Sequence, residues 1–163
     1  MILLADANVL FDFGWVEDGL HHLTSLGPLE VLENVRDEIR EDDILQILVD
    51  LRVTIVPLQD SWSDAIRGEK KGGLSLPDAT CLHYARTYGR TVLTSERTLR
   101  KRCQQNGVNV HGSLWVVKQL HERHHCAPEL LCAWLKSWLE DDARLPQDVL
   151  AEIRILLGCP GFS

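Results

Sequence analysis

Short apolar runs alternate with segments whose apolar residues recur every three or four positions through the first 112 residues. The runs are typical of strands, and they lie at 2–5, 29–35, 53–58, 91–94 and 108–110. Between them, the spacing predicts helices over 7–13, 16–26, about 37–51, 61–71, 74–88 and 96–106. This alternation predicts an α/β domain with a mostly parallel sheet of about five strands.

From Ser113 onward the pattern is purely helical, with helices predicted over 113–125, 128–142 and 146–157. We therefore expect residues 1–112 to form the α/β domain and residues 113–163 a helical extension packed on it. Trp134, Leu135 and Trp138 form an apolar stripe at helical spacing, together with Leu130 and Leu131. Core packing is the first interpretation of this stripe, and a homodimer or partner surface is the second.

Composition narrows the class of protein. With 163 residues, of which 45% are apolar and 25% charged, the chain is long enough for one well-packed domain. No apolar run approaches the roughly 20 residues of a membrane span. The N-terminus has no basic segment and Asp6 interrupts its apolar run, so we expect no secretory signal and a cytoplasmic location.

The cysteines do not suggest a disulfide framework. There are five of them, an odd number, and no two have the CxxC spacing. In a reducing compartment such residues are buried small hydrophobes or inert thiols. A second Cys/His feature, His121 with His124, His125 and Cys126, raises structural zinc, but no second ligand cluster follows, and a polar helix face explains it better.

A net charge of −7 argues against a broad basic surface for nucleic acid. The charges are nevertheless segregated, with acids at 30–43 and 140–142 and bases at 97–102. A metal site made of carboxylates would make the metal-free protein look more acidic than its working form.

Four acidic residues lie at or near the junctions between predicted strands and predicted helices. Asp6 follows the first strand and Glu96 the fourth, Glu38 opens the helix after the second strand, and Asp78 lies in the first helical turn before the fourth. Each has a structural explanation: Asp6 as an N-cap, Asp78 in a capping box with Ser75, and the two glutamates as helix-start charges.

Their joint placement favours a site. Ligands of parallel α/β sheets bind at the carboxyl ends of the strands, where all four acids converge if the first and fourth strands are neighbours. Clustered carboxylates raise one another's pKa unless a cation is present, and an oxygen-only cluster selects Mg²⁺ or Mn²⁺. Asn8 and Thr94 would complete such a site by hydrogen bonding, although both residues are also ordinary at helix starts.

The chain resembles the PIN domain family over most of its length. The stretches that match are Asp6-Ala7-Asn8-Val9-Leu10, Val35-x-x-Glu38-Ile39, Gly73-Leu74-Ser75-x-x-Asp78-Ala79 and Leu93-Thr94-Ser95-Glu96-x-x-Leu99-Arg100. Gly107-Val108-x-Val110-x-Gly112 and Arg144-Leu145-Pro146 resemble the branch with extra C-terminal helices, which includes prokaryotic type II toxins.

That resemblance implies a three-layer α/β/α fold and an endoribonuclease that hydrolyses RNA phosphodiester bonds with Mg²⁺ or Mn²⁺. It implies Asp6, Glu38, Asp78 and Glu96 as catalytic metal ligands, with Glu96 standing where the family usually has aspartate. Around them, Asn8, Thr94 and Ser95 would support the ligands, while Arg97, Arg100 and Lys101 would meet the RNA backbone or simply form a solvated helix face.

Two functional interpretations stay open. The first is a metal-dependent ribonuclease, with a toxin role, an antitoxin partner and a homodimer as the further expectations. The second is a catalytically weak PIN-like module that binds RNA or a protein, with the longer Glu96 side chain as a sign of weakened chemistry.

Overall fold

The computed structural model describes residues 1–141 and 145–160, and in that part of the chain five strands form one sheet. The strands are β1 (Leu3–Ala5), β2 (Leu29–Leu32), β3 (Thr54–Val56), β4 (Thr91–Leu93) and β5 (Val110–His111). They are all parallel, in the order β3-β2-β1-β4-β5. The first and fourth strands are therefore neighbours, as the convergence of the acids requires.

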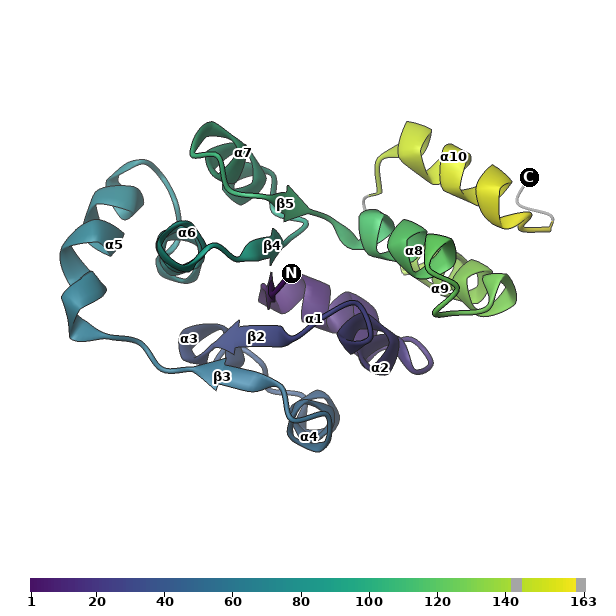
Figure 1. Cartoon of the computed structure of the whole chain (residues 1–163), viewed down its shortest axis with the longest axis horizontal. Coiled ribbons are helices and arrows are strands. Elements are labelled where there is room, and N and C mark those ends of the chain that lie inside the picture. The colour runs from purple at the N-terminus through teal and green to yellow at the C-terminus, as the bar shows by residue number, and fades with distance from the viewer. Residues whose placement is uncertain (142–144, 161–163) are drawn as a thin grey trace.

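Helices cover both faces of this sheet and make the fold a three-layer α/β/α sandwich, as predicted (Figure 1). One face carries α1 (Ala7–Gly14), α2 (Gly19–Thr24) and α4 (Asp42–Asp50), and the other carries α5 (Ser63–Lys71), α6 (Leu76–Tyr88) and α7 (Arg97–Gln105). The short α3 (Glu33–Arg36) follows β2 directly, and the 3-10 turn η1 (Asp60–Trp62) precedes α5.

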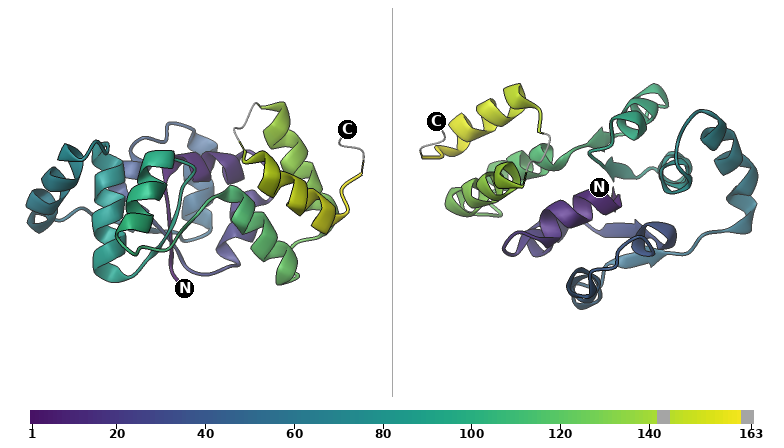
Figure 2. Two further views of the ribbon diagram at one scale, coloured as in Figure 1. Left: turned by 90° about the horizontal axis from the view of Figure 1, so that it is seen from above. Right: turned by 180° about the vertical axis from the view of Figure 1, so that it is seen from behind.

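The C-terminal helices α8 (Ser113–Glu122), α9 (Pro128–Glu140) and α10 (Gln147–Leu157) stack outside α1 and α2 (Figures 1 and 2). Trp134 and Trp138 of α9 are 1% and 4% exposed, and both rings meet Phe13 of α1 edge-on, at centroid distances of 5.8 and 5.3 Å. Their indole N–H groups donate to the carbonyls of Glu17 and Asp12, each at 2.9 Å. The stripe is thus core, and that interpretation is confirmed.

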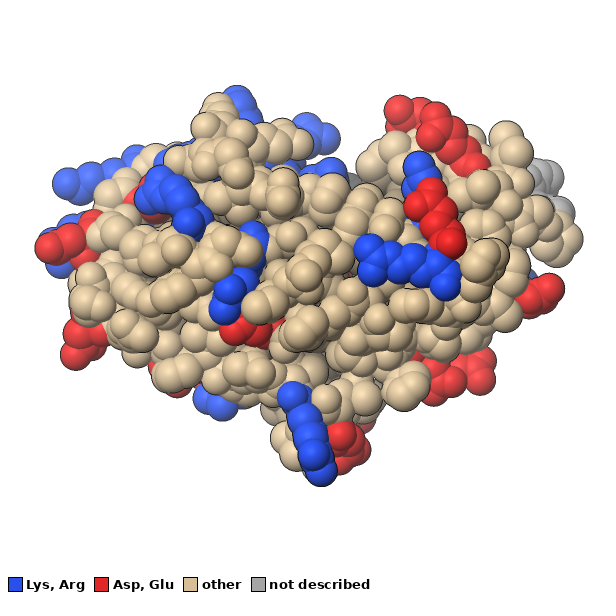
Figure 3. Space-filling model, viewed as in Figure 1, with Lys and Arg blue, Asp and Glu red and all other residues tan. Residues whose placement is uncertain are grey.

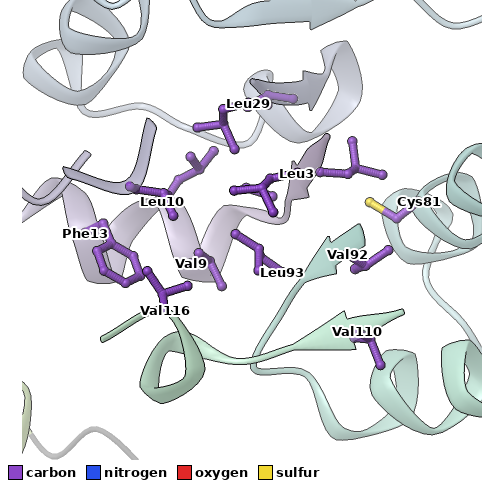
Figure 4. Close-up of a cluster of buried hydrophobic side chains, with 14 of the residues drawn as sticks. Leu3, Val9, Leu10, Phe13, Leu29, Cys81, Val92, Leu93, Val110 and Val116 are labelled. Carbon is purple, nitrogen blue, oxygen red and sulfur yellow. The ribbon is translucent and has the colours of Figure 1, made fainter. Parts of the chain in front are cut away.

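The strands are apolar because they lie between two helical layers. All three residues of β1 are buried, and so are those of β4. In Figure 4, Leu3 and Leu93 lie toward Val9 and Leu10 of α1, whereas Val92 lies toward Cys81 of α6. No helix in the described residues is both long and apolar enough to cross a membrane.

Two predicted boundaries were wrong. The helix expected over 37–51 begins only at Asp42, as α4, because a turn holds Glu38 between the end of α3 at Arg36 and the start of α4. Ile39 donates its N–H back to the Arg36 carbonyl and buries its side chain, which turns the chain between the two helices. The fifth strand begins at Val110, because Gly107 adopts a left-handed φ of 68° and the Val108 N–H caps the Cys103 carbonyl at the end of α7.

Smaller differences between the predicted and observed bounds concern the second strand and the helix that precedes it. β2 stops at Leu32 where 29–35 was expected, and α2 covers only Gly19–Thr24 of 16–26, since Asp18 before it has a φ of 54°. The predicted end of the helix over 128–142 and Arg144 of the Arg144-Leu145-Pro146 motif lie outside the described residues.

The expectation of only free thiols was wrong for one pair. Cys132 on α9 and Cys159 after α10 form a disulfide, with a Cα–Cα distance of 5.6 Å across a sequence separation of 27. The packing of α10 against α9 brings these distant residues together, and no local sequence spacing signals that. Cys81, Cys103 and Cys126 are free and buried, as expected.

Candidate functional site

The carboxyl edge of the sheet collects the four acids. Asp6 follows the last residue of β1, Thr94 and Glu96 follow β4, and Glu38 lies in the turn after α3, beyond the end of β2. Asp78 is in the first turn of α6. In Figure 2 (left), β1 rises from the N-terminus and α1 begins at the opposite end of the strand, which is the edge in question.

Asp6 combines a structural and a site role. It is the N-cap of α1: its Oδ1 accepts a hydrogen bond from the Val9 N–H at 3.0 Å. Its other oxygen, Oδ2, accepts a hydrogen bond from the Thr94 hydroxyl, which lies on the neighbouring strand end. The cap interpretation is therefore confirmed, and the same carboxylate also lies in the wall of a pocket.

That pocket has a volume of about 310 Å³ and brings the predicted acids together. Its lining consists of Asp6, Ala7, Asn8, Val35, Glu38, Ser75, Pro77, Asp78 and Glu96. All four acids contribute, although they come from four different segments of the chain. The pocket therefore concentrates negative charge, and within residues 1–141 and 145–160 no Lys or Arg side chain forms an ion pair with any of the four acids.

Asn8 and Thr94 organise Glu96. The Asn8 side-chain amide donates to Glu96 Oε1 at 2.7 Å, and the Glu96 N–H donates to Thr94 Oγ1 at 3.0 Å. Thr94 thus donates to Asp6 and accepts from Glu96, so one buried hydroxyl fixes the distance between the two strand ends. Both residues hold the ligand candidates as predicted.

The pKa values reflect burial and mutual repulsion. The pKa of Asp6 is raised to about 7; burial is the largest cause, Asp78 and Glu96 also raise it, and the hydrogen bonds from Thr94 and Val9 lower it. The pKa of Asp78 is raised by burial and then by Glu96, while Ser75 lowers it. The pKa of Glu38 is raised by burial and by Asp78. A cation in the pocket would remove this penalty.

The donor set suits Mg²⁺ or Mn²⁺ in kind, because it consists of carboxylate and amide oxygens. The side chains are spread around the pocket: within the described residues, no three Asp, Glu, His or Cys groups are close enough together to enclose an ion. Glu38 is exposed, and Glu96 accepts a hydrogen bond from Asn8.

The basic residues of α7 lie beside the pocket and outside its lining. Arg97 and Lys101 are exposed, Arg100 is half-buried, and Ser95 is exposed at the strand end. Arg102 is occupied, since it pairs with Glu69 and donates to the Gly72 carbonyl at 3.2 Å. On the face shown in Figure 3, basic and acidic side chains are interspersed.

Four residues of the lining were not predicted as site residues, and one of them, Ala7, directly follows Asp6. Val35 precedes Glu38 by three positions, and Ser75 precedes Asp78 by three, with Pro77 between them. Ser75 was noted only as a cap, a role it has: its Oγ accepts from the Asp78 N–H at 3.2 Å. The signal for Val35 and Ser75 was their position three residues before an acid, and the signal for Ala7 and Pro77 was their place next to one. Elsewhere, His125 lies 3.1 Å from Ser25 Oγ through its Nδ1.

Fold and site together define a class: a parallel three-layer α/β protein with an acidic pocket at the carboxyl edge of its sheet. Comparison with models of known protein families gave no match, and comparison with curated proteins gave no significant match. The function must therefore be argued from the pocket.

Proposed function

We propose that this protein is a metal-dependent endoribonuclease of the PIN class. The observation that supports the proposal is the convergence of Asp6, Glu38, Asp78 and Glu96 on one pocket at the carboxyl edge of a parallel sheet. Burial, with a further contribution from Asp78 and Glu96, raises the pKa of Asp6, so its charged form is disfavoured in the metal-free pocket. A divalent cation is the partner that makes this arrangement favourable.

Asp6, Asp78, Glu38 and Glu96 would hold Mg²⁺ or Mn²⁺, which when bound supplies an activated water and neutralises charge on the phosphate in the transition state. Asp6 is the best-fixed of the four, since Val9 and Thr94 restrain both of its oxygens. Asn8 keeps Glu96 at the pocket wall. Arg97, Arg100 and Lys101 would bind phosphates on either side of the cleavage position.

The wider role we propose is that of a toxin in a type II toxin–antitoxin pair, acting on RNA in the cytoplasm as a homodimer. An antitoxin would place a basic side chain in the acidic pocket, because only a cation relieves its repulsion. In a reducing cytoplasm the Cys132–Cys159 disulfide would be open.

A second function also has an observation in its favour. Glu96 is longer than the aspartate that the resemblance implies, and it is bound by Asn8. A chain whose fourth acid stays in that position would bind RNA or a protein partner with little turnover. Metal binding without cleavage would identify it.

The test is cleavage of structured and single-stranded RNAs in Mn²⁺, Mg²⁺ or EDTA. We compare the wild-type chain with Asp6→Asn and Asp78→Asn, and use Asp148→Asn, an exposed aspartate on α10, as the matched control. We expect metal-dependent cleavage in wild type and control, and a loss of about 100-fold or more in both pocket variants. Equal cleavage by all four proteins would exclude the pocket as the catalytic site.

A further inference from the structure

An aromatic surface leads away from the acidic pocket along α1. Asn8, Phe11 and Trp15 recur at positions i, i+3 and i+7, so they share one face of this region of the chain. Phe11 and Trp15 are stacked, with ring centroids 5.1 Å apart and an interplanar angle of 18°. Asn8 lines the pocket, which places the start of this face at the site itself.

A second stacked pair lies where β5 passes into α8. The rings of His111 and Trp115 are 4.0 Å apart and nearly parallel, at 5°. A hydrogen bond of 2.7 Å from Ser113 Oγ to Asp12 Oδ2 joins this segment to α1. Asp12 is next to Phe11 in the chain, and Ser113 lies between His111 and Trp115, so the hydrogen bond links the two aromatic pairs.

Among these rings, Trp15 is exposed, while Phe11, His111 and Trp115 are half-buried. Trp15 is 60% exposed, whereas Trp62, Trp134 and Trp138 are all at most 4% exposed. Leaving an indole in water forfeits the burial that normally stabilises it. Trp15 contributes to the core far less than its size allows, and a stacking partner from outside would recover that contribution.

A cation accompanies the second pair. Arg100 of α7 approaches the chain at Gly112, since a Cβ placed there would lie 3.3 Å from Arg100 Nη1. Burial and Arg100 lower the pKa of His111, so its ring is a neutral aromatic surface at pH 7. Aromatic rings beside a cation are the combination that binds single-stranded nucleic acid, where bases stack and phosphates pair.

We propose that Phe11–Trp15 and His111–Trp115 form a stacking surface for unpaired bases of an RNA strand that crosses the acidic pocket. From Asn8 to Trp15 the seven-residue rise is about 10 Å, which spans about three stacked nucleotides at about 3.4 Å each. The bases bound there would flank the phosphate at the pocket. This inference rests on the proposed ribonuclease function and specifies its substrate as unpaired RNA.

Binding is measured in an Asp78→Asn background with Mg²⁺ present, so that cleavage does not consume the probe. The probes are a short unstructured oligoribonucleotide and the same strand with alternate bases removed, both labelled for fluorescence anisotropy. Trp15→Ala removes the exposed ring and Trp15→Phe keeps an aromatic one. Tyr88→Ala is the matched control, because Tyr88 is 42% exposed and its ring lies 4.9 Å from that of Tyr84, but it precedes β4 at the amino edge of the sheet.

We expect the intact strand to bind about 5- to 150-fold more tightly than the abasic one, the range for one stacked base. Trp15→Ala should remove most of this difference, whereas Trp15→Phe and Tyr88→Ala should keep it, and thermal melting of each variant checks folding. Equal binding of the two strands, or an unchanged preference in folded Trp15→Ala, would overturn the stacking surface. A base preference that depends on Trp15 in a protein that never cleaves RNA would instead refute the nuclease and leave the stacking surface standing.

Discussion

Replacing Asp6 by asparagine should stabilise the metal-free protein at neutral pH, although it removes a residue central to the site. The pKa of Asp6 is raised from 3.8 to about 7 in the folded chain. Between pH 3.8 and pH 7, Asp6 is therefore protonated in the folded state and ionised in the unfolded state. The contribution of Asp6 to the free energy of unfolding is fully present below pH 3.8 and falls by about 4 kcal/mol as the pH rises through 7.

The asparagine variant keeps the geometry and loses the charge. Its amide oxygen accepts from the Val9 N–H as Oδ1 does now, and its amide nitrogen can donate to the Thr94 hydroxyl. The variant should therefore lack the contribution of residue 6 to the pH dependence. Between pH 5 and pH 8 the wild-type chain should lose about 2–3 kcal/mol of unfolding free energy relative to the variant.

Urea unfolding in EDTA across this pH range measures the difference, and the comparison cancels groups common to both proteins. Adding Mn²⁺ should raise the stability of the wild-type chain most at high pH, because the metal binds the ionised carboxylate. Parallel pH profiles for the two proteins in EDTA would refute the burial of a costly charge at Asp6. A Mn²⁺ effect of equal size in Asp6→Asn would refute its role as a ligand.

Two further predictions concern the C-terminal helices. Reducing the Cys132–Cys159 disulfide, or replacing both residues by serine, should lower the unfolding free energy by about 3–4 kcal/mol, since the bond closes a loop of 27 residues. Urea unfolding with and without dithiothreitol measures this change. The double serine variant is the control, because its stability should not respond to the reductant. Trp134→Ala should lower the unfolding free energy by about 3–5 kcal/mol, because a buried ring and its hydrogen bond to the Glu17 carbonyl are both lost. The control is Ile155→Ala on α10, a residue that is 83% exposed, which should change the unfolding free energy by less than about 0.5 kcal/mol.

Apolar periodicity predicted the fold because buried strands and amphipathic helices give different patterns of apolar residues in this chain. A strand buried on both faces has no polar alternation, so the runs at 2–5 and 91–94 identified β1 and β4. Gly89, with its φ of 70°, ended α6 where predicted. The turn at Glu38 was not predictable in the same way, because the buried Ile39 that shapes it depends on contacts made elsewhere in the fold.

The site was predictable as a set of residues and much less as a geometry. Asp6, Glu38, Asp78 and Glu96 could be brought together by the rule that parallel strands end at one edge. The hydrogen bond from the Asn8 amide to the Glu96 carboxylate depends on side-chain rotamers, which the sequence does not specify. The disulfide was missed for a similar reason: only the packing of α10 on α9 brings Cys132 and Cys159 within bonding distance.

The strand order also dictates when the pocket can exist during synthesis of the chain. The central strand β1 is made first, yet its partner β4 comes about 90 residues later, with Leu3 opposite Thr91 and Ala5 opposite Leu93. Until β4 emerges, β1 has an open edge and Asp6 lacks the hydroxyl of Thr94. Such long-range pairing is slow because a large loop must close first. Any activity of the pocket therefore begins only after Glu96 is synthesised, and truncated chains that end before β4 carry an unprotected strand edge and no site.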